Sequence, residues 1–153
     1  MHKGLRILFV PSWYPSQNSP MGGTFFREQA QALATEGSEV IVLHPEVCYW
    51  RTPGHLWSGL FRSHCHQRGN LLEVLESGPT LSLRRRVGLV TWEIRVLLLY
   101  LRYFRRIGRP DVIHAQSAFP GACAARLLAK LLSTPLVITE HQSDYFDGAY
   151  TPW

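Results

Sequence analysis

The 153-residue sequence predicts an α/β fold in which a mainly parallel sheet is covered by helices on both faces. Short apolar runs that are typical of buried strands alternate along the chain with longer segments whose apolar residues recur at helical spacing. Glycines and prolines separate these runs, as expected at the turns between strands and helices. Right-handed crossovers restrict such a chain to a doubly wound sheet, and we expect its five strands in the order 3-2-1-4-5.

The first strand, loop and helix form the most informative part of the sequence. Apolar residues 5–10 predict a strand that ends at Pro11, because proline has no N–H to donate to a neighbouring strand. Residues 11–23, counted from that proline, contain three prolines and end in two adjacent glycines, the second of which is Gly23. Thr24 is the expected N-cap of a helix that ends at Gly37.

The remaining strands and helices continue the same alternation. Strands are expected at residues 40–43, 71–76, 111–115 and 136–139. Helices are expected in the arginine-rich segment that ends at Gly108 and at residues 120–132. Between residues 45 and 70 we expect an irregular excursion, because aromatic, basic and glycine residues occur there without clear periodicity.

The basic residues are concentrated in the first of these two helices. The segment from Arg84 to Arg109 contains eight arginines and one acid, so its net charge is +7, whereas the rest of the chain carries −2. Its apolar residues form one helical stripe, which we expect to face the core: Val90, Ile94, Leu97, Leu101 and Phe104. Two interpretations stay open for the arginines near its ends, a solvated rim or contact with an anionic membrane. The arginines concerned are Arg84, Arg85, Arg86, Arg102, Arg105 and Arg106.

Composition argues against several other classes of protein. Cys48, Cys65 and Cys123 are an odd number at irregular spacing, which favours reduced thiols and a cytoplasmic protein. His64 and His66 flank Cys65 directly and lack the spacing of metal ligands, so no metal is expected. The first apolar run is too short for a signal peptide, and no apolar stretch is long enough to span a membrane. Nucleic acid is not expected as a partner, because no recognition motif accompanies the basic helix.

Polar residues follow three of the predicted strands at the edge where doubly wound sheets bind their ligands. The glycine loop follows the first strand, Gln116, Ser117 and Phe119 follow the fourth, and Glu140 and His141 follow the fifth. Glycines before a helix let the backbone approach an anion, and the free N–H groups of the first helical turn point toward it. A phosphate-bearing ligand is one interpretation of the loop. A plain turn is the other, because the spacings of the dinucleotide fingerprint and the P-loop are missing.

Two segments of the chain resemble a known family. Residues 10–43 read VPSWYPSQNSPMGGTFFREQAQALATEGSEVIVL, and residues 110–141 read PDVIHAQSAFPGACAARLLAKLLSTPLVITEH. Both resemble the N-terminal domain of family 4 glycosyltransferases of the GT-B fold, with the PSWYP opening and the later TEH as the most specific parts. The resemblance implies that residues 1–153 form a Rossmann-like, acceptor-side half of such an enzyme, and that the C-terminal donor-binding domain is absent from this sequence.

The resemblance also implies roles for individual residues. Gly22, Gly23 and Thr24 would approach the diphosphate of a nucleotide-sugar donor, and His141 would act at the reaction centre. The acceptor side would be formed by Trp13, Tyr14, Gln116, Ser117, Phe119 and Glu140. Many relatives have H-x-H where this chain has His114-Ala115-Gln116, so an amide that cannot take up a proton stands in the second position. An imidazole such as that of His141 can hydrogen-bond sugar hydroxyls or carry a proton near neutral pH. The alternative interpretation is a structural histidine that hydrogen-bonds backbone groups at the end of a strand.

The expected function is therefore retaining transfer of a sugar from a nucleotide-diphosphate donor to a sugar or lipid-linked acceptor, without a further cofactor. The chain alone would be inactive until a C-terminal catalytic half completes the cleft in trans. The alternative is a non-catalytic subunit that docks a separate catalytic half to a membrane. In both cases we expect a cytoplasmic protein, with peripheral contact to the inner face of the membrane as an open alternative. The aromatic residues Tyr145, Phe146, Tyr150 and Trp153 suit stacking on sugars or an interface between domains.

Overall fold

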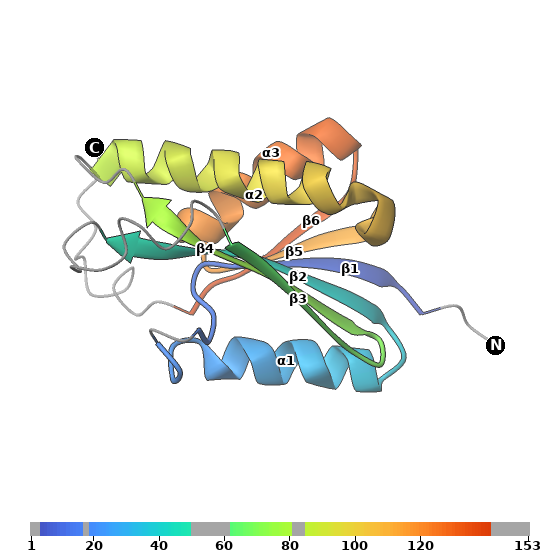
Figure 1. Cartoon of the computed structure of the whole chain (residues 1–153). Coiled ribbons are helices and arrows are strands. Elements are labelled where there is room, and N and C mark those ends of the chain that lie inside the picture. The colour runs from blue at the N-terminus through green and yellow to red at the C-terminus, as the bar shows by residue number, and fades with distance from the viewer. Residues whose placement is uncertain (1–3, 17–18, 50–61, 81–84, 142–153) are drawn as a thin grey trace.

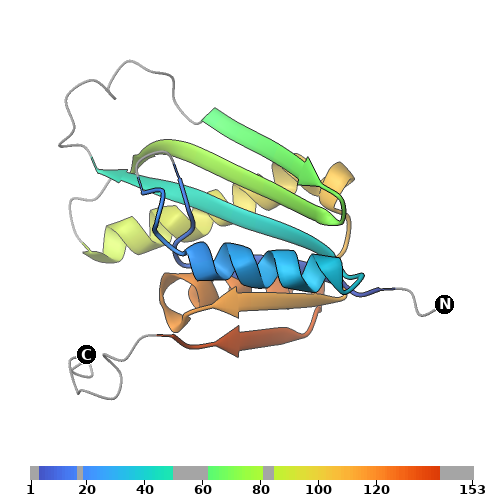
Figure 2. The same ribbon diagram turned by 90° about the horizontal axis from the view of Figure 1, so that it is seen from below.

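The computed structural model describes residues 4–16, 19–49, 62–80 and 85–141. It confirms a three-layer α/β fold, in which α1 covers one face of a six-stranded sheet and α2 and α3 cover the other (Figures 1 and 2). The strands are β1 (Arg6–Pro11), β2 (Glu39–Tyr49), β3 (Arg62–Arg68), β4 (Leu71–Thr80), β5 (Val112–Gln116) and β6 (Leu136–Thr139). The helices are α1 (Thr24–Thr35), α2 (Arg85–Ile107) and α3 (Cys123–Leu132), and a short irregular helical turn, η1 (Ala118–Ala122), precedes α3.

The strand order across the sheet is β3-β4-β2-β1-β5-β6. The five strands expected from the sequence pair in parallel and in the expected order 3-2-1-4-5. The structure adds β3, which pairs antiparallel with β4 at the edge of the sheet, inside the segment that we expected to be irregular. The sequence of β3, RSHCHQR, has no apolar run because most of its side chains are exposed, so hydrophobic periodicity could not reveal it.

Helix α1 begins one residue earlier than it would if Thr24 were its N-cap. Gly23 occupies the N-cap position with a φ of 71°, and Thr24 is the first helical residue, so the prediction of Thr24 as N-cap is wrong. The predicted stop at Gly37 is confirmed by its φ of 95°. The N–H of Ser38 donates to Leu33 O over 3.2 Å, which closes the helix in the Schellman arrangement.

The apolar stripe of α2 lies on the opposite side from the one predicted. Val90, Ile94, Leu101 and Phe104 are 46–58% exposed, and Leu97 is only half-buried. The side of α2 that packs on the sheet carries Trp92, Arg95, Val96, Leu99, Tyr100 and Ile107. Periodicity alone could not choose between the two sides, because both are rich in apolar residues. The aromatic rings bury more area than the aliphatic stripe, and their polar atoms find partners in the core.

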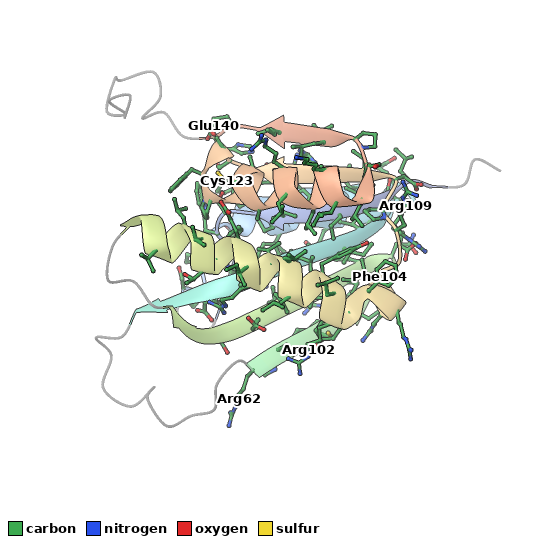
Figure 3. The ribbon with its side chains drawn as sticks, turned by 90° about the horizontal axis from the view of Figure 1, so that it is seen from above. Arg62, Arg102, Phe104, Arg109, Cys123 and Glu140 are labelled. Carbon is green, nitrogen blue, oxygen red and sulfur yellow. The ribbon has the colours of Figure 1, made fainter. Side chains whose placement is uncertain are left out.

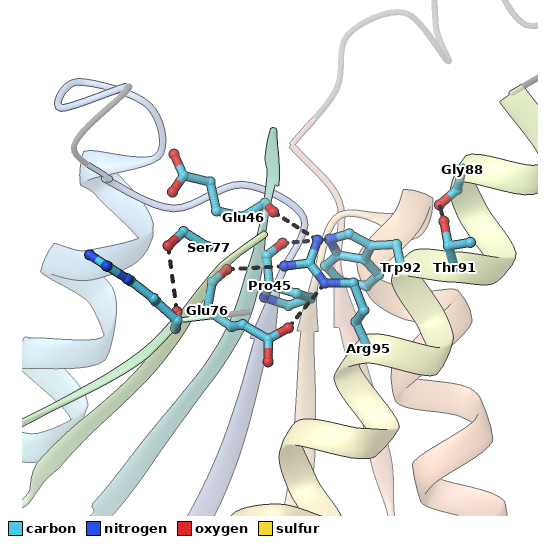
Figure 4. Close-up of polar contacts among 9 residues, drawn as sticks. Pro45, Glu46, Glu76, Ser77, Gly88, Thr91, Trp92 and Arg95 are labelled. Carbon is cyan, nitrogen blue, oxygen red and sulfur yellow. Dashed lines mark hydrogen bonds and ion pairs between the residues drawn. The ribbon is translucent and has the colours of Figure 1, made fainter. Parts of the chain in front are cut away.

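Those partners are shown in Figure 4, where Trp92 and Arg95 reach from α2 to the ends of β2 and β4. The indole Nε1 of Trp92 donates to Pro45 O over 2.9 Å. The guanidinium of Arg95 pairs with Glu76 over 3.0 Å and donates to Glu46 O over 2.9 Å. The ion pair is buried on both sides. It therefore fixes the orientation of α2, because removing one partner of a buried pair is strongly destabilising.

Candidate functional site

The predicted site lies at the carboxyl edge of the sheet, where β1, β5 and β6 end. Pro11 of β1 is in register with Gln116 of β5, and Gln116 is in register with Thr139 of β6. The loops that leave these three strands are therefore neighbours, as the strand order predicted. A further hydrogen bond joins β5 to the end of β6: the N–H of Ser117 donates to Thr139 O over 2.8 Å.

A chain of polar side chains crosses this edge, and we call it the Gln116 network. Oε1 of Gln116 lies 2.6 Å from Nε2 of His141. Nε2 of Gln116 lies 2.9 Å from Oε1 of Gln29 and 3.1 Å from Nε2 of His114. Nε2 of His114 in turn lies 2.8 Å from Oγ1 of Thr139. Gln116 is fully buried, so its carboxamide relies on these partners rather than on water.

The ring of His141 is held from a second side by the first turn of α1. Its centroid lies 5.2 Å from the ring of Phe26 and 5.4 Å from the ring of Phe25. Phe26 is fully buried and also packs against Trp13, whose ring is 5.3 Å away. His141 thus joins the end of β6 to the start of α1, although the residue as a whole is exposed.

The glycine loop is shaped by close packing as well as by backbone conformation. A Cβ added at Gly23 would lie 2.7 Å from Trp13 O, and the φ of 71° is strained for any other residue. A Cβ at Gly22 would meet the hydroxyl of Ser19, which would have to turn away. At the start of the helix, the N–H groups of Thr24 and Phe25 have no hydrogen-bond partner among the described residues. These two N–H groups are therefore available to an anion.

Glu140 connects η1 to His141. Its Oε2 accepts a hydrogen bond from the N–H of Ala118 over 2.6 Å, and its Oε1 accepts one from the N–H of His141 over 2.8 Å. The carboxylate of Glu140 therefore positions the backbone on both sides of the site.

Ser117 is a polar residue of this edge with a strained backbone. Its φ of 69° is rare outside glycine, and the residue is fully buried. Its Oγ has no hydrogen-bond partner among the described residues. An unsatisfied hydroxyl and a strained backbone at the end of a strand are features that concentrate at functional sites.

Tyr14 is not brought to the site. It is buried on the α1 side of the sheet, where its hydroxyl donates to Glu73 over 2.6 Å, and Arg27 pairs with the same carboxylate over 3.0 Å. Burial, and next the hydrogen bond to Glu73, raise the pKa of Tyr14 far above its usual range. Its hydroxyl is therefore a fixed, protonated donor within the fold.

Sequence reasoning missed three residues of α1 that contact the site. Phe25 and Phe26 pack against His141, and Gln29 accepts a hydrogen bond from Gln116. A signal for the last two existed, since Phe26 and Gln29 are three residues apart and so lie on one face of a helix. Burial, and next the charge of a nearby protonated His141, lower the pKa of His114. The lowered pKa favours the neutral ring of His114.

Other parts of the described chain add no second site of the predicted kind. Two open hollows of about 550 and 440 Å³ lie at the opposite, amino edge of the sheet, and neither is lined by a predicted site residue. No group of three metal-ligating side chains occurs in the described ranges. None of the helices described is long and apolar enough to cross a membrane. The predicted aromatic residues from Tyr145 to Trp153 lie outside the described residues.

Comparison with known proteins gives a family and a relative. A family model described as "Glycosyl transferase 4-like domain" matches residues 22–153. The chain is also similar to the "Putative teichuronic acid biosynthesis glycosyltransferase TuaC" of Bacillus subtilis (strain 168), with 25% identity over 167 aligned positions. That alignment covers 95% of this chain but only 40% of the relative. Since the family model covers most of the sequence, the chain belongs to the family of glycosyl transferase 4-like domains.

Proposed function

We propose that this domain supplies the acceptor side of a retaining glycosyltransferase that uses a nucleotide-diphosphate sugar. The observation that carries the proposal is the position of His141. Its ring is bonded to Gln116 over 2.6 Å and packs on the first turn of α1, where the N–H groups of Thr24 and Phe25 have no hydrogen-bond partner among the described residues. An anion site next to a group that can bond sugar hydroxyls suits a sugar diphosphate.

In this proposal the donor diphosphate lies at the start of α1. Gly22 and Gly23 let it approach the backbone, and the N–H groups of Thr24 and Phe25 point at its oxygens. Departure of the nucleotide diphosphate builds negative charge there, and preorganised N–H dipoles stabilise charge that grows in the transition state. One helix terminus supplies only about 0.3–1 kcal/mol, so most of the stabilisation must come from elsewhere.

The acceptor in this proposal lies on the side of η1. The orphan hydroxyl of Ser117, the ring of Phe119 and the half-buried Trp13 are the groups offered to it. Gln116 positions His141, and Glu140 positions η1 through the N–H of Ala118. Tyr14 anchors the glycine loop to the sheet through its bond to Glu73. The acceptor class that we propose is a sugar or a lipid-linked sugar.

The chain spans about two fifths of the length of the relative that it matches. We propose that a second, donor-binding half supplies the rest of the cleft and that the domain alone does not turn over. The domain would then bind nucleotide sugars weakly by itself.

The test mixes the 153-residue chain with the remaining part of the Bacillus relative, and measures release of nucleoside diphosphate from a panel of nucleotide sugars with membrane-extracted acceptors. We expect release only when both parts are present, and a loss of at least about 100-fold for His141→Ala. His66→Ala, at an exposed position of β3, is the matched control and should retain activity. Full activity of His141→Ala, or tight nucleotide-sugar binding by the domain alone, would contradict the proposal.

A second proposal concerns the membrane and rests on what we call the α2–α3 apolar face. Its exposed residues are Val87, Val90, Ile94, Leu98, Leu101 and Phe104 of α2, and Leu127 and Leu131 of α3. The two helices pack side by side on one face of the sheet, with Arg102 and Phe104 on their outer surface (Figure 3). An exposed apolar surface of this extent marks a site of association with a protein or a membrane.

The charge of this face favours an anionic bilayer over a second copy of the chain. Apart from Arg95, which is buried against Glu76, the sequences of α2 and α3 contain seven basic residues and one acid, so two such faces would repel each other. Arg102, Arg105 and Arg106 are exposed at one end of α2, where each would gain about 1 kcal/mol beside anionic headgroups. The side chains of Arg84, Arg85 and Arg86, the other predicted contacts, lie outside those described. We propose a cytoplasmic domain that contacts the inner face of the membrane here.

Sedimentation with vesicles of phosphatidylcholine, with or without phosphatidylglycerol, tests this second proposal. We expect binding to the anionic vesicles that weakens with added salt, and that is lost in a variant with Ile94→Ser and Leu101→Ser. Leu5→Ser, at an exposed residue before β1, is the control and should still bind. Equal sedimentation with both vesicle types, or none with either, would remove the proposal.

A further inference from the structure

We infer that Gln116 is a positioning residue, whose carboxamide holds His141 and His114 in opposite tautomers and leaves Nδ1 of His141 as the ring nitrogen that a ligand hydroxyl meets. The role of that nitrogen toward a ligand rests on the proposed function. The coupling between the two rings rests only on the geometry of the Gln116 network.

The first step is the chemistry of a carboxamide, which accepts hydrogen bonds only at its oxygen and donates them only at its nitrogen. Oε1 of Gln116 lies 2.6 Å from Nε2 of His141, so that ring nitrogen must carry a proton. Nε2 of Gln116 lies 3.1 Å from Nε2 of His114, so that ring nitrogen must present its lone pair. One side chain thus requires opposite states of the same atom in two histidines.

The second step is what fixes the direction of the carboxamide. Oε1 of Gln29 accepts the other hydrogen of the Gln116 amide over 2.9 Å. The hydroxyl of Thr139 also lies 2.8 Å from Nε2 of His114, so the single lone pair of that nitrogen is shared between this hydroxyl and the Gln116 amide in a three-centre hydrogen bond. Turning the amide of Gln116 around would require Gln29, Thr139 and both rings to change together, in a place where Gln116 is closed to water.

The third step concerns which histidine can gain a proton. Burial lowers the pKa of His114, which keeps that ring neutral and agrees with a lone pair on its Nε2. His141 already carries its proton on Nε2, so taking up a second proton on Nδ1 leaves its bond to Gln116 intact. Nδ1 of His141 has no partner among the described residues. It is therefore an acceptor for an O–H donor, which a sugar supplies and a fully ionised phosphate does not.

The experiment reads the ring nitrogens directly, by NMR of the 153-residue chain with ¹⁵N-labelled histidine at a pH where both rings are neutral. We expect His141 as the Nε2–H tautomer and His114 as the Nδ1–H tautomer. Since this measurement uses the unaltered chain, it needs no variant to fold. Finding both rings in the same tautomer would overturn the inference.

Two substitutions then test whether Gln116 causes the difference. In Gln116→Glu the carboxylate only accepts hydrogen bonds, so we expect the Nε2 of His114 to become protonated while His141 keeps its Nε2–H. In Gln116→Met the coupling is removed and the ring signals of both histidines should shift. Gln31→Met, two residues from Gln29 on α1 and outside the network, is the matched control and should change neither ring. A His114 that keeps its tautomer in Gln116→Glu would overturn the inference.

Activity separates this inference from the proposed function. With the second half of the enzyme present, we expect Gln116→Met to lower kcat up to about 100-fold, with a smaller change in KM for the nucleotide sugar, because a misplaced group loses orientation more than binding. Opposite tautomers without any sugar transfer would retain the coupling and reject the proposed function. Sugar transfer by a chain whose two histidines share one tautomer would support the proposed function and reject the coupling through Gln116.

Discussion

The carboxyl edge of the sheet and the outer side of α2 differ in how their side chains are used. At the edge, Gln116, His141 and Glu140 are each bonded to a partner from another element. On the outer side of α2, six large apolar side chains are 43–58% exposed and have no element of the described chain over them. The polar side chains of the first region are held by contacts within the domain, whereas the apolar side chains of the second are exposed to a binding partner outside it. The difference teaches that sequence periodicity detects apolar surface but not what covers it.

The largest effect should come from the anchor that decides which side of α2 is buried. Arg95→Met leaves Glu76 as an unpaired buried carboxylate, and we expect it to lower the free energy of unfolding by about 3–5 kcal/mol. Urea unfolding measures this loss. Arg102→Met, at an exposed arginine on the same helix, is the control and should change stability by less than about 0.5 kcal/mol. Equal effects of the two substitutions would break the comparison, because the buried side of α2 would then have no special anchor.

The second effect is a pH dependence of stability, which we expect from the buried His44 and not from the residues of the site. His44 is buried, and its Nδ1 lies 3.2 Å from Pro11 O. Burial lowers the pKa of His44 from 6.5 to about 4, so between these values the unfolded chain binds the proton that the folded chain excludes. Its contribution to stability is complete above pH 6.5 and is lost as the pH falls toward 4, by about 3 kcal/mol.

Unfolding in urea at several pH values from 7.5 downward measures this slope. His44→Asn keeps a donor near the position of Nδ1 but cannot be protonated, so its stability should fall less with pH. His64→Asn, at an exposed residue of β3, should retain the slope of the unaltered chain. If His44→Asn and the unaltered chain lose stability in parallel, the buried histidine is not the cause.

A smaller effect is expected from the glycine loop at the site. Gly23→Ala combines a left-handed backbone with a Cβ that would lie 2.7 Å from Trp13 O, so we expect a loss of roughly 2–3 kcal/mol. Gly37→Ala has a similar backbone strain but open space around its Cβ, and should cost about 1 kcal/mol. The difference between the two, measured by thermal or urea unfolding, isolates the contact with Trp13. No difference would mean that the loop has room for a side chain.

Much of the fold could be predicted because it follows from local signals and one topological rule. The five parallel strands were visible as apolar runs, and their order brought the loops of Gly23, Gln116 and His141 together. The edge strand β3 was not visible, because its exposed residues carry no pattern. The bond of Tyr14 to Glu73 joins residues 59 positions apart, so no local pattern reports it. The network around Gln116 depends on Gln29 in the same way.

The smallest effect on stability, that of Leu98→Ala, sharpens the comparison most, because it is measured against the adjacent, buried Leu99 of the same helix. Leu98 is 57% exposed and Leu99 is 1% exposed. Leu99→Ala should lower stability by about 2–5 kcal/mol through the cavity that it leaves in the core. Leu98→Ala should stay within about 0.5 kcal/mol of the unaltered chain in urea unfolding, since the isolated domain leaves this side chain in water. In the presence of anionic vesicles, Leu98→Ala should instead weaken sedimentation, since removing an exposed apolar group matters only where something covers it. A leucine that is neutral for folding and necessary for binding would identify the outer side of α2 as a surface shaped for contact rather than for the core.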